Sequence, residues 1–373
     1  MADERAATAY PEGGASRRVV YGTLTYGLAS VLQRAAPLLL LPLFAQILSP
    51  EEFGQIGIIL TLTAALSTVA ALGLETAVFR GYRQAAAEAQ GPAEFVSSLG
   101  WFGILAPFGV AAIGLILLGP LVVGGFDLPP VAVALGAVTA SATASATIVP
   151  LAILRAQERL RTYLALTSAQ VLISAGLAIF LIVVLDLGVV GWMLGSALAG
   201  LVILVRGVLA VEQPLARHVN RSLVVAALAF GLPLVPHALA HWGLAVSDRA
   251  ILGAFLDQAV VGVYYVAFLF SLPVSLIAIA ISQATQPLFA GAALTREQQS
   301  TLGRVVSIQS AVVILVGAAA ALLGPPASRL ILPAEYADAA RYIPLLCLGT
   351  TLFGLYLAPM NAISLIAGRT GRV

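Results

Sequence analysis

Long apolar blocks separated by short polar breaks run along the chain from about residue 19 to its end. Blocks of 18 or more residues with almost no charge are typical of transmembrane helices, because about 20 residues cross the hydrocarbon core of a bilayer. Backbone groups cannot stay unpaired in lipid, and these solid blocks lack the alternation of barrel strands. The pattern predicts ten helical spans, with the approximate bounds Val19–Ile47, Phe53–Phe79, Phe95–Val123, Val131–Leu154, Tyr163–Leu185, Gly188–Val205, Leu223–Ser247, Ala259–Ala290, Val305–Leu323 and Ile343–Ala367.

The composition agrees with a membrane location. Apolar residues make up 60% of the 373 positions and charged residues only 10%, whereas about a quarter of the residues in a soluble domain are charged. The expected fold class is therefore an all-α polytopic membrane protein. The single cysteine, Cys347, excludes an intrachain disulfide and a cysteine-based metal site, and no cofactor is expected. Residues 1–18 are polar, lack the cleavage site of a signal peptide and are expected to form a disordered tail.

The arginines indicate how the spans are oriented. All 19 basic residues are arginine, and with the N-terminus inside, fifteen of them fall in inner segments. Only Arg249, Arg329 and Arg341 fall outside, and Arg34 lies within the first span. This asymmetry over short loops satisfies the positive-inside rule. We therefore expect both termini on the cytoplasmic side of the membrane.

Two segments of the chain resemble each other at a fixed separation. LSPEEFGQIGIILTL (Leu48–Leu62) and LDQAVVGVYYVAFLF (Leu256–Phe270) each place a glycine six residues after the leucine, Gly54 and Gly262, at an offset of 208. A fainter match, LRAQERLR against LIAGRTGR, has an offset near 211. Six spans separate the copies, so both halves share one orientation, as in transporters built from parallel repeats. Chance recurrence of short apolar motifs is the alternative.

Three segments give the chain a family resemblance. LSPEEFGQIGI, SDRAILGAFLDQAVVGVYYVA and AEYADAARYIPLL, in this order, resemble the lipid-linked oligosaccharide flippases. These form the polysaccharide-biosynthesis branch of the MOP/MATE superfamily, which also holds the multidrug and toxin extrusion antiporters. The resemblance implies two lobes of six helices around a central cavity that opens alternately to each side. It also implies a polyprenyl-pyrophosphate-linked glycan of the O-antigen or lipopolysaccharide type as substrate, and membrane lipids and polysaccharide-assembly proteins as partners.

The chain departs from this family pattern near its C-terminus. It stops at Val373 after ten predicted spans, whereas the family has at least twelve. We expect a complete first lobe over residues 19–217 and a second lobe over residues 218–373 that lacks the last helices.

Arg34 places a charge inside the first predicted span, beside Pro37 and Pro42. Such a charge costs about 2.5–3.5 kcal/mol on insertion scales and persists where it faces protein or water. Each proline removes a backbone hydrogen bond and bends the helix, which is tolerated where the helix lines a cavity. We predict that Arg34 faces the central cavity and binds the pyrophosphate of the substrate, since the N–H donors of its planar guanidinium group match the geometry of phosphate oxygens. Alternatively, Arg34 pairs with Glu75 or hydrogen-bonds freed carbonyl groups.

The seventh span has similar interruptions, Gly231, Pro233 and Pro236, followed by His237 and His241. Interrupted helices at corresponding places in two repeats indicate a binding site, and protonated histidine would assist Arg34. The four-residue spacing suits a metal, but no acidic or cysteine partner accompanies the pair, so no metal is expected. Buried, hydrogen-bonded histidines are the main expectation, and pH-sensing cavity residues the second.

Other polar residues in or beside the spans are candidates for coupling or binding. Glu75 either extends to the inner interface beside Arg80 or is the titrating half of a coupling ion pair. Asp248 and Arg249 resemble the signature pair of the family, and we expect an interfacial ion pair that holds the outer end of the seventh span. The candidate sugar-facing residues are Gln33, Gln283, Gln286 and Asn361.

Other functions fit the sequence less well. A glycan polymerase or ligase needs a substantial outer loop with catalytic residues, and the longest predicted one, about Gly324–Tyr342, carries no acid/base constellation. A drug or cation antiporter would favour acidic cavity residues, whereas this cavity is predicted to be basic. A non-transporting scaffold is a third alternative. Nucleic-acid binding is not indicated, because anionic lipid headgroups account for the inner arginines.

Overall fold

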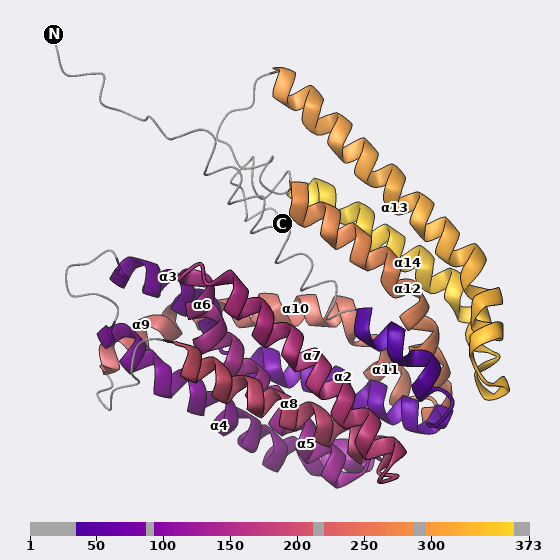
Figure 1. The fold of residues 1–373 in the computed structure, drawn as a ribbon, viewed down its shortest axis with the longest axis horizontal. Coiled ribbons are helices and arrows are strands. Elements are labelled where there is room, and N and C mark those ends of the chain that lie inside the picture. The colour runs from indigo at the N-terminus through magenta and orange to yellow at the C-terminus, as the bar shows by residue number, and fades with distance from the viewer. Residues whose placement is uncertain (1–34, 87–92, 212–219, 286–295, 362–373) are drawn as a thin grey trace.

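The computed structural model describes residues 35–86, 93–211, 220–285 and 296–361, and the regular elements in these ranges are all helices (Figure 1). After a short helix, Ala35–Phe44, they are α2 (Pro50–Ala70), α3 (Leu74–Ala86), α4 (Ala93–Phe126), α5 (Pro130–Ala146), η1 (Thr147–Leu151), α6 (Ala152–Ala156), α7 (Leu160–Val183), α8 (Gly188–Ala210), α9 (Arg221–Gly231), η2 (Leu232–Leu234), α10 (Val235–Val246), α11 (Asp248–Gly253), α12 (Gln258–Thr285), α13 (Arg296–Ile331), η4 (Ala334–Tyr336) and α14 (Ala339–Asn361).

Nine helical stretches in the described ranges are long and apolar enough to cross a membrane. They correspond to predicted spans two to ten, most of them with small shifts at the ends, and they confirm the all-α polytopic fold. Of the first predicted span, residues 19–34 lie outside the described ranges, and the remainder contains the helix Ala35–Phe44.

The second span ends earlier than the sequence pattern predicts. α2 stops at Ala70 and not near Phe79. Leu72 and Gly73 take left-handed backbone conformations, with φ of 51° and 65°, which end the helix. The chain resumes as α3, which with 13 residues, several of them polar or charged, is too short and too polar to be a candidate span.

This break lies against the break in the seventh span. That span is interrupted as predicted, since α9 ends at Gly231 and the 3₁₀ turn η2 contains Pro233 before α10 begins. A Cβ atom on Gly73 would lie 2.0 Å from the carbonyl oxygen of Gly231, and one on Gly231 would lie 2.5 Å from that of Leu72. Glycine at both positions allows the two backbones to touch, so α3 packs on α9 and α2 packs on α10.

α2 and α12 cross at the two glycines that the sequence repeat relates. A Cβ atom on Gly54 would lie 1.9 Å from the carbonyl oxygen of Gln258, and one on Gly262 would lie 1.8 Å from that of Pro50. Gln258 follows Pro50 by the same 208 positions that separate Gly262 from Gly54, so the contact is reciprocal. Reciprocal contacts are what a two-fold relation between two copies produces. The crossing therefore supports the internal repeat.

Polar contacts join the two halves of the protein beside this crossing. The Gln55 side-chain amide donates to Gln258 Oε1 at 2.8 Å, and Gln258 Nε2 donates to the carbonyl oxygen of Asp127 at 2.9 Å. Tyr336 is 1% exposed and donates its hydroxyl to the carbonyl oxygen of Leu48 at 2.7 Å. A tyrosine phenol is protonated at neutral pH, and burial raises the pKa of Tyr336 further, so this group is a donor throughout the neutral range.

The helices of the two halves meet at the end of the molecule where α2 and α12 cross, and they diverge toward the opposite end. Figure 1 shows α12 and α14 beside α13, all three leaning away from α3, α6 and α9. α12, α13 and α14 pack on one another, while α9 and α10, which the sequence assigns to the second lobe, pack on α3, α4 and α2. The lobe boundary at residues 217–218 stays a prediction, because residues 212–219 lie outside the described ranges.

Candidate functional site

A cavity of about 450 Å³ lies within the first half of the chain. Its walls come from the helix Ala35–Phe44, from α2, α5, η1, α7 and α8, and from Tyr265 of α12. The polar and aromatic side chains that line it, beside Tyr265, are Phe44, Thr139, Thr143, Thr147, Tyr163, Thr167, Gln170, Ser174, Trp192 and Ser196.

Helical periodicity explains why these side chains meet at one cavity. Residues three or four apart share one face of a helix, and the intervals between the lining residues of α5, η1 and α7 follow this rule. The Thr139 hydroxyl donates to the carbonyl oxygen of Leu135 at 2.9 Å, one turn earlier, and Thr147 and Thr167 make the same type of bond. The oxygen lone pairs of Thr139 and Thr147 remain available as acceptors. Within the described residues the structure gives the Gln170 amide no hydrogen-bond partner.

The described lining of this cavity is neutral. None of its described residues carries a carboxylate or a guanidinium group. Trp192 packs on Phe44, with ring centroids 4.7 Å apart, and presents a flat aromatic surface among the hydroxyl groups. Hydroxyl, amide and indole groups together suit an uncharged, hydroxyl-rich ligand better than a cation.

An ion pair lies near the Tyr163 end of the cavity. Arg155 of α6 donates to the carboxylate of Glu75 on α3, and their side chains are 32% and 44% exposed. The Arg155 guanidinium also lies 5.8 Å from the centre of the Phe79 ring. Tyr163 is within electrostatic range of both charges. The pair therefore joins α3 to the end of the α5–α6 segment at the edge of the cavity.

This partner of Glu75 is not one that the sequence suggested. The Arg80 guanidinium lies 5.5 Å from the centre of the Phe230 ring. Arg34 lies outside the described ranges, so its place in the cavity and its pairing with Glu75 stay predictions. The titration of Glu75 is likewise still a prediction.

His237 and His241 are both exposed on α10, so the expectation of buried, hydrogen-bonded histidines is wrong. The reason is the face through which α10 packs. Trp242 donates from Nε1 to the carbonyl oxygen of Thr61 on α2 at 3.0 Å, which leaves the histidines on a different face. Among the described residues, no group of three or more His, Cys, Asp or Glu could hold a metal ion.

The expected ion pair between Asp248 and Arg249 is not found in the described structure. Asp248 Oδ2 accepts a hydrogen bond from the Tyr264 hydroxyl at 2.5 Å. Arg249 is 5% exposed, and its guanidinium lies 4.8 Å from the ring centre of Tyr265 and 4.1 Å from that of Phe268. Aromatic rings of α12 thus take the place of the carboxylate as the partner of the cation. Both residues attach α11 to α12.

The predicted structural residues have clear places in the fold. Pro37 lines the cavity and Pro42 is partly buried in the same short helix. Gly54 and Gly262 form the crossing of α2 and α12.

The predicted sugar-facing residues are not brought together in the described structure. Gln283 lies on α12, outside the cavity lining. Gln33 and Gln286 lie outside the described ranges, and Asn361 ends α14 with a side chain that is not described.

Sequence reasoning missed the serine and threonine side chains that line the cavity from α5, η1, α7 and α8. Their signal is present in SATASAT (Ser141–Thr147) and in the three- and four-residue spacing of polar positions on α7. Small hydroxyl residues are common in apolar spans, so this signal does not stand out beside a lone arginine.

Comparisons with known proteins place the chain in a family. A family model described as "Polysaccharide biosynthesis protein" matches residues 43–341. A search of curated proteins found no match.

The described fold is similar to solved transporter structures. An inward-facing multidrug resistance MATE family transporter of the MOP superfamily is 13% identical with a TM-score of 0.59, over 92% of this chain and 86% of that one. The outward-facing conformation of such a transporter is 16% identical with a TM-score of 0.53, over 96% and 86%. A MATE protein in complex with MaD5 is 17% identical with a TM-score of 0.53, over 92% and 85%. The chain therefore belongs to the polysaccharide biosynthesis protein family, and it has the fold of the MATE transporters.

Proposed function

We propose that this protein moves a polyprenyl-pyrophosphate-linked oligosaccharide across a bacterial cytoplasmic membrane by alternating access. The observation that carries the proposal is the cavity of the first half, whose described lining offers hydroxyl, amide and indole groups without a carboxylate. A glycan presents hydroxyl groups that donate and accept, and such a lining can satisfy them. Membership of the polysaccharide biosynthesis family supports a glycan as the cargo.

The arrangement of the helices supports alternating access. The two halves touch through backbone contacts and buried polar contacts at one end, and they diverge at the other. Similar folds are known in inward-facing and outward-facing conformations. The positive-inside rule places the arginine-rich ends of the spans in the cytoplasm, so the proposal assigns the diverging end to the cytoplasmic side.

The charged part of the substrate requires a cationic partner. Arg34 remains our proposed ligand of the pyrophosphate, for the reasons of charge and geometry given above. Pro37, which lines the cavity, follows it by three positions. In this arrangement the arginine binds the anion while the neutral cavity receives sugar residues.

A drug or cation antiporter is the second candidate, and the fold similarity favours it. A cation in a low-dielectric cavity needs a carboxylate or aromatic cage to offset its desolvation. Glu75, which interacts electrostatically with Tyr163 of the cavity lining, is already paired with Arg155. The lining contains aromatic rings, but its described residues include no carboxylate, and its hydroxyl and amide groups match the hydroxyl groups of a glycan, so we favour the glycan.

Removing two polar groups from the cavity tests the proposed cargo. A Thr139→Val, Gln170→Leu double variant should lower surface glycan export about tenfold, because each neutral hydrogen bond contributes about 0.5–1.5 kcal/mol. Export is measured as labelled surface polysaccharide at matched membrane levels of the protein.

The matched control is Thr68→Val. The Thr68 hydroxyl donates to the carbonyl oxygen of Ala64 at 2.8 Å, the same type of bond that Thr139 makes, but Thr68 does not line the cavity. Thr68→Val should export normally. Normal export by the double variant would show that the cavity does not receive the glycan.

A further inference from the structure

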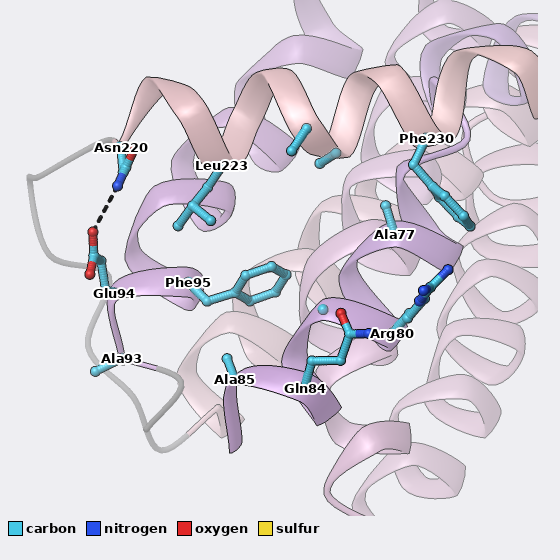
Figure 2. Close-up of a pocket in the computed structure, with 13 residues that line it drawn as sticks. Ala77, Arg80, Gln84, Ala85, Ala93, Glu94, Phe95, Asn220, Leu223 and Phe230 are labelled. Atoms are coloured by element: carbon cyan, nitrogen blue, oxygen red, sulfur yellow. Dashed lines mark hydrogen bonds between the residues drawn. The ribbon is translucent and has the colours of Figure 1, made fainter. Parts of the chain in front are cut away.

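A second and larger cavity lies between α3, the start of α4 and α9 (Figure 2). Its volume is about 700 Å³, within the range of about 300–1,000 Å³ that is usual for ligand pockets. None of its described lining residues belongs to the cavity of the proposed function, so it is a separate site.

Small residues on two facing helices create this space. α3 contributes Gly81 and Ala85, four positions apart on one helical face, and α9 contributes Ala226 and Ala227. The Phe95 ring of α4 lies against Gly81, where an added Cβ atom would come within 2.4 Å of the ring. The small side chains therefore leave room for a ligand, and one aromatic ring offers it an apolar surface.

Polar side chains from all three walls complete the lining. Arg80 and Gln84 come from α3, Glu94 comes from the start of α4, and Asn220 directly precedes α9 (Figure 2). Glu94 accepts a hydrogen bond from the side-chain amide of Asn220 at 2.9 Å. Arg80 and Gln84 are exposed, and within the described structure neither side chain has a hydrogen-bond partner. Both can therefore bind a ligand.

The two ends of the cavity lie at different depths in the membrane. Candidate spans start at the residue before Glu94 and at the residue after Asn220, so these two side chains lie at the membrane boundary. Phe230 follows Asn220 by ten positions, which is about 15 Å along a helix axis. The Arg80 guanidinium lies 5.5 Å from the centre of the Phe230 ring, so its charge lies within the apolar layer. A charge at that depth persists where it meets water, protein or an anion.

This order of groups indicates the chemistry of the ligand. A phospholipid would place its phosphate at the boundary and its acyl chains deeper, which is the reverse of the order in this cavity. The cavity suits a ligand with a deep anionic group and a hydrogen-bonding body that extends toward the boundary. A glycosyl phosphate has this form, because its phosphate oxygens match the N–H donors of Arg80. Its sugar hydroxyls can donate to the Glu94 carboxylate and exchange hydrogen bonds with the Gln84 amide.

We propose that this cavity binds a glycosyl phosphate group, with the phosphate at Arg80 and the sugar toward Glu94 and Asn220. The proposal rests on the proposed function for the source of this group, and it adds an entry site for the same cargo, whose carrier chain would continue from the phosphate into the apolar layer. α3 leads from this cavity to the edge of the other one, because Glu75 in its first turn pairs with Arg155 there. A free sugar phosphate carries the same group, so the test compares both sources.

Protection of a cysteine in the lining tests the site in the full chain. Ala85→Cys places a thiol in the cavity, whereas Ala86→Cys places one on the next, exposed residue outside the lining. The native Cys347 is buried. Citronellyl-diphosphate-linked N-acetylglucosamine, at about four times its Kd, should slow maleimide alkylation of Ala85→Cys about fivefold, because a fifth of the sites stay empty. Alkylation of Ala86→Cys should be unchanged, and mass spectrometry measures both rates.

Two charge variants, each combined with Ala85→Cys, show whether Arg80 is the ligand of the phosphate. Arg80→Gln should raise the concentration needed for protection about tenfold, the scale of one hydrogen bond to a charged group. Arg83→Gln removes an exposed arginine of α3 outside the lining and should leave that concentration unchanged.

The remaining comparisons separate the sources and the two proposals. Better protection by the carrier-linked sugar than by N-acetylglucosamine 1-phosphate would identify the cargo as the source, and equal protection would identify a soluble sugar phosphate. Absence of protection, equal losses in Arg80→Gln and Arg83→Gln, or equal protection by citronellyl phosphate without a sugar would each overturn the site. Transport in liposomes without protection would overturn the entry site alone, and protection without transport would overturn the proposed function alone.

Discussion

Gly262→Ala is expected to destabilise the protein strongly, because it adds a methyl group where two helix backbones touch. The new Cβ atom would lie 1.8 Å from the carbonyl oxygen of Pro50 and 2.8 Å from the amide nitrogen of Gly54. Both are backbone atoms of α2, so no side chain can rotate away, and the two helices must separate. Overpacking typically costs about 1–3 kcal/mol and sometimes more. We expect the upper end of this range, seen as a melting temperature lowered by several degrees in detergent.

Gly176→Ala is the matched control for this prediction. Gly176 lies within α7, and an added Cβ atom there meets nothing within 4 Å. Alanine is the better helix former by about 1 kcal/mol, so the melting temperature should stay the same or rise slightly. A Gly262→Ala protein as stable as the wild type would show that α2 and α12 do not touch at this crossing, and the reciprocal contact would then no longer support the repeat.

Breaking the pair between Glu75 and Arg155 is the second change with a large expected effect. Glu75→Gln leaves the half-buried arginine without its carboxylate, and a hydrogen bond to a charged group contributes about 1.5–3 kcal/mol. Partial exposure places the expected loss toward the lower end of this range. The double variant Glu75→Arg, Arg155→Glu should recover part of the lost stability, because the opposite charges face each other again. Thermal unfolding of the purified variants measures both effects.

The surface pair of Asp338 and Arg341 is the control for this prediction. Its charges are 3.8 Å apart and its side chains are 79% and 73% exposed, so Asp338→Asn should change stability by no more than about 0.5 kcal/mol. If Glu75 is also the coupling group, Glu75→Gln should abolish the dependence of transport on a pH gradient. An unchanged dependence in a folded Glu75→Gln protein would remove the coupling role and leave a structural pair.

The sequence predicted the features that depend on local pattern. Solid apolar blocks predicted the spans, and Pro233 and Gly231 predicted the break in the seventh. The 208-residue offset related Gly54 to Gly262, and both glycines lie at the crossing of α2 and α12. Glycine is needed on both helices there, because the two backbones approach too closely for a side chain.

Features that depend on distant contacts could not be read in this way. The left-handed conformation of Leu72 has no signal in its residue type, since leucine rarely adopts it. Arg155 lies 80 positions from Glu75, so only the folded chain reveals the pair. The exposure of His237 and His241 depends on which face of α10 meets α2, and the apolar residues around them do not indicate that face.

The most direct test of the transport proposal is a reconstitution of the purified chain in liposomes. A polyprenyl-pyrophosphate oligosaccharide with a fluorescent label on its sugar is placed in both leaflets, and a membrane-impermeant quencher is added outside. We predict that the signal decays to a level below that of the inner leaflet alone, that Thr139→Val, Gln170→Leu slows this decay, and that a labelled phosphatidylcholine is unaffected. Retention of the inner-leaflet signal by the wild type, together with exchange of an organic cation for protons in the same liposomes, would contradict the account.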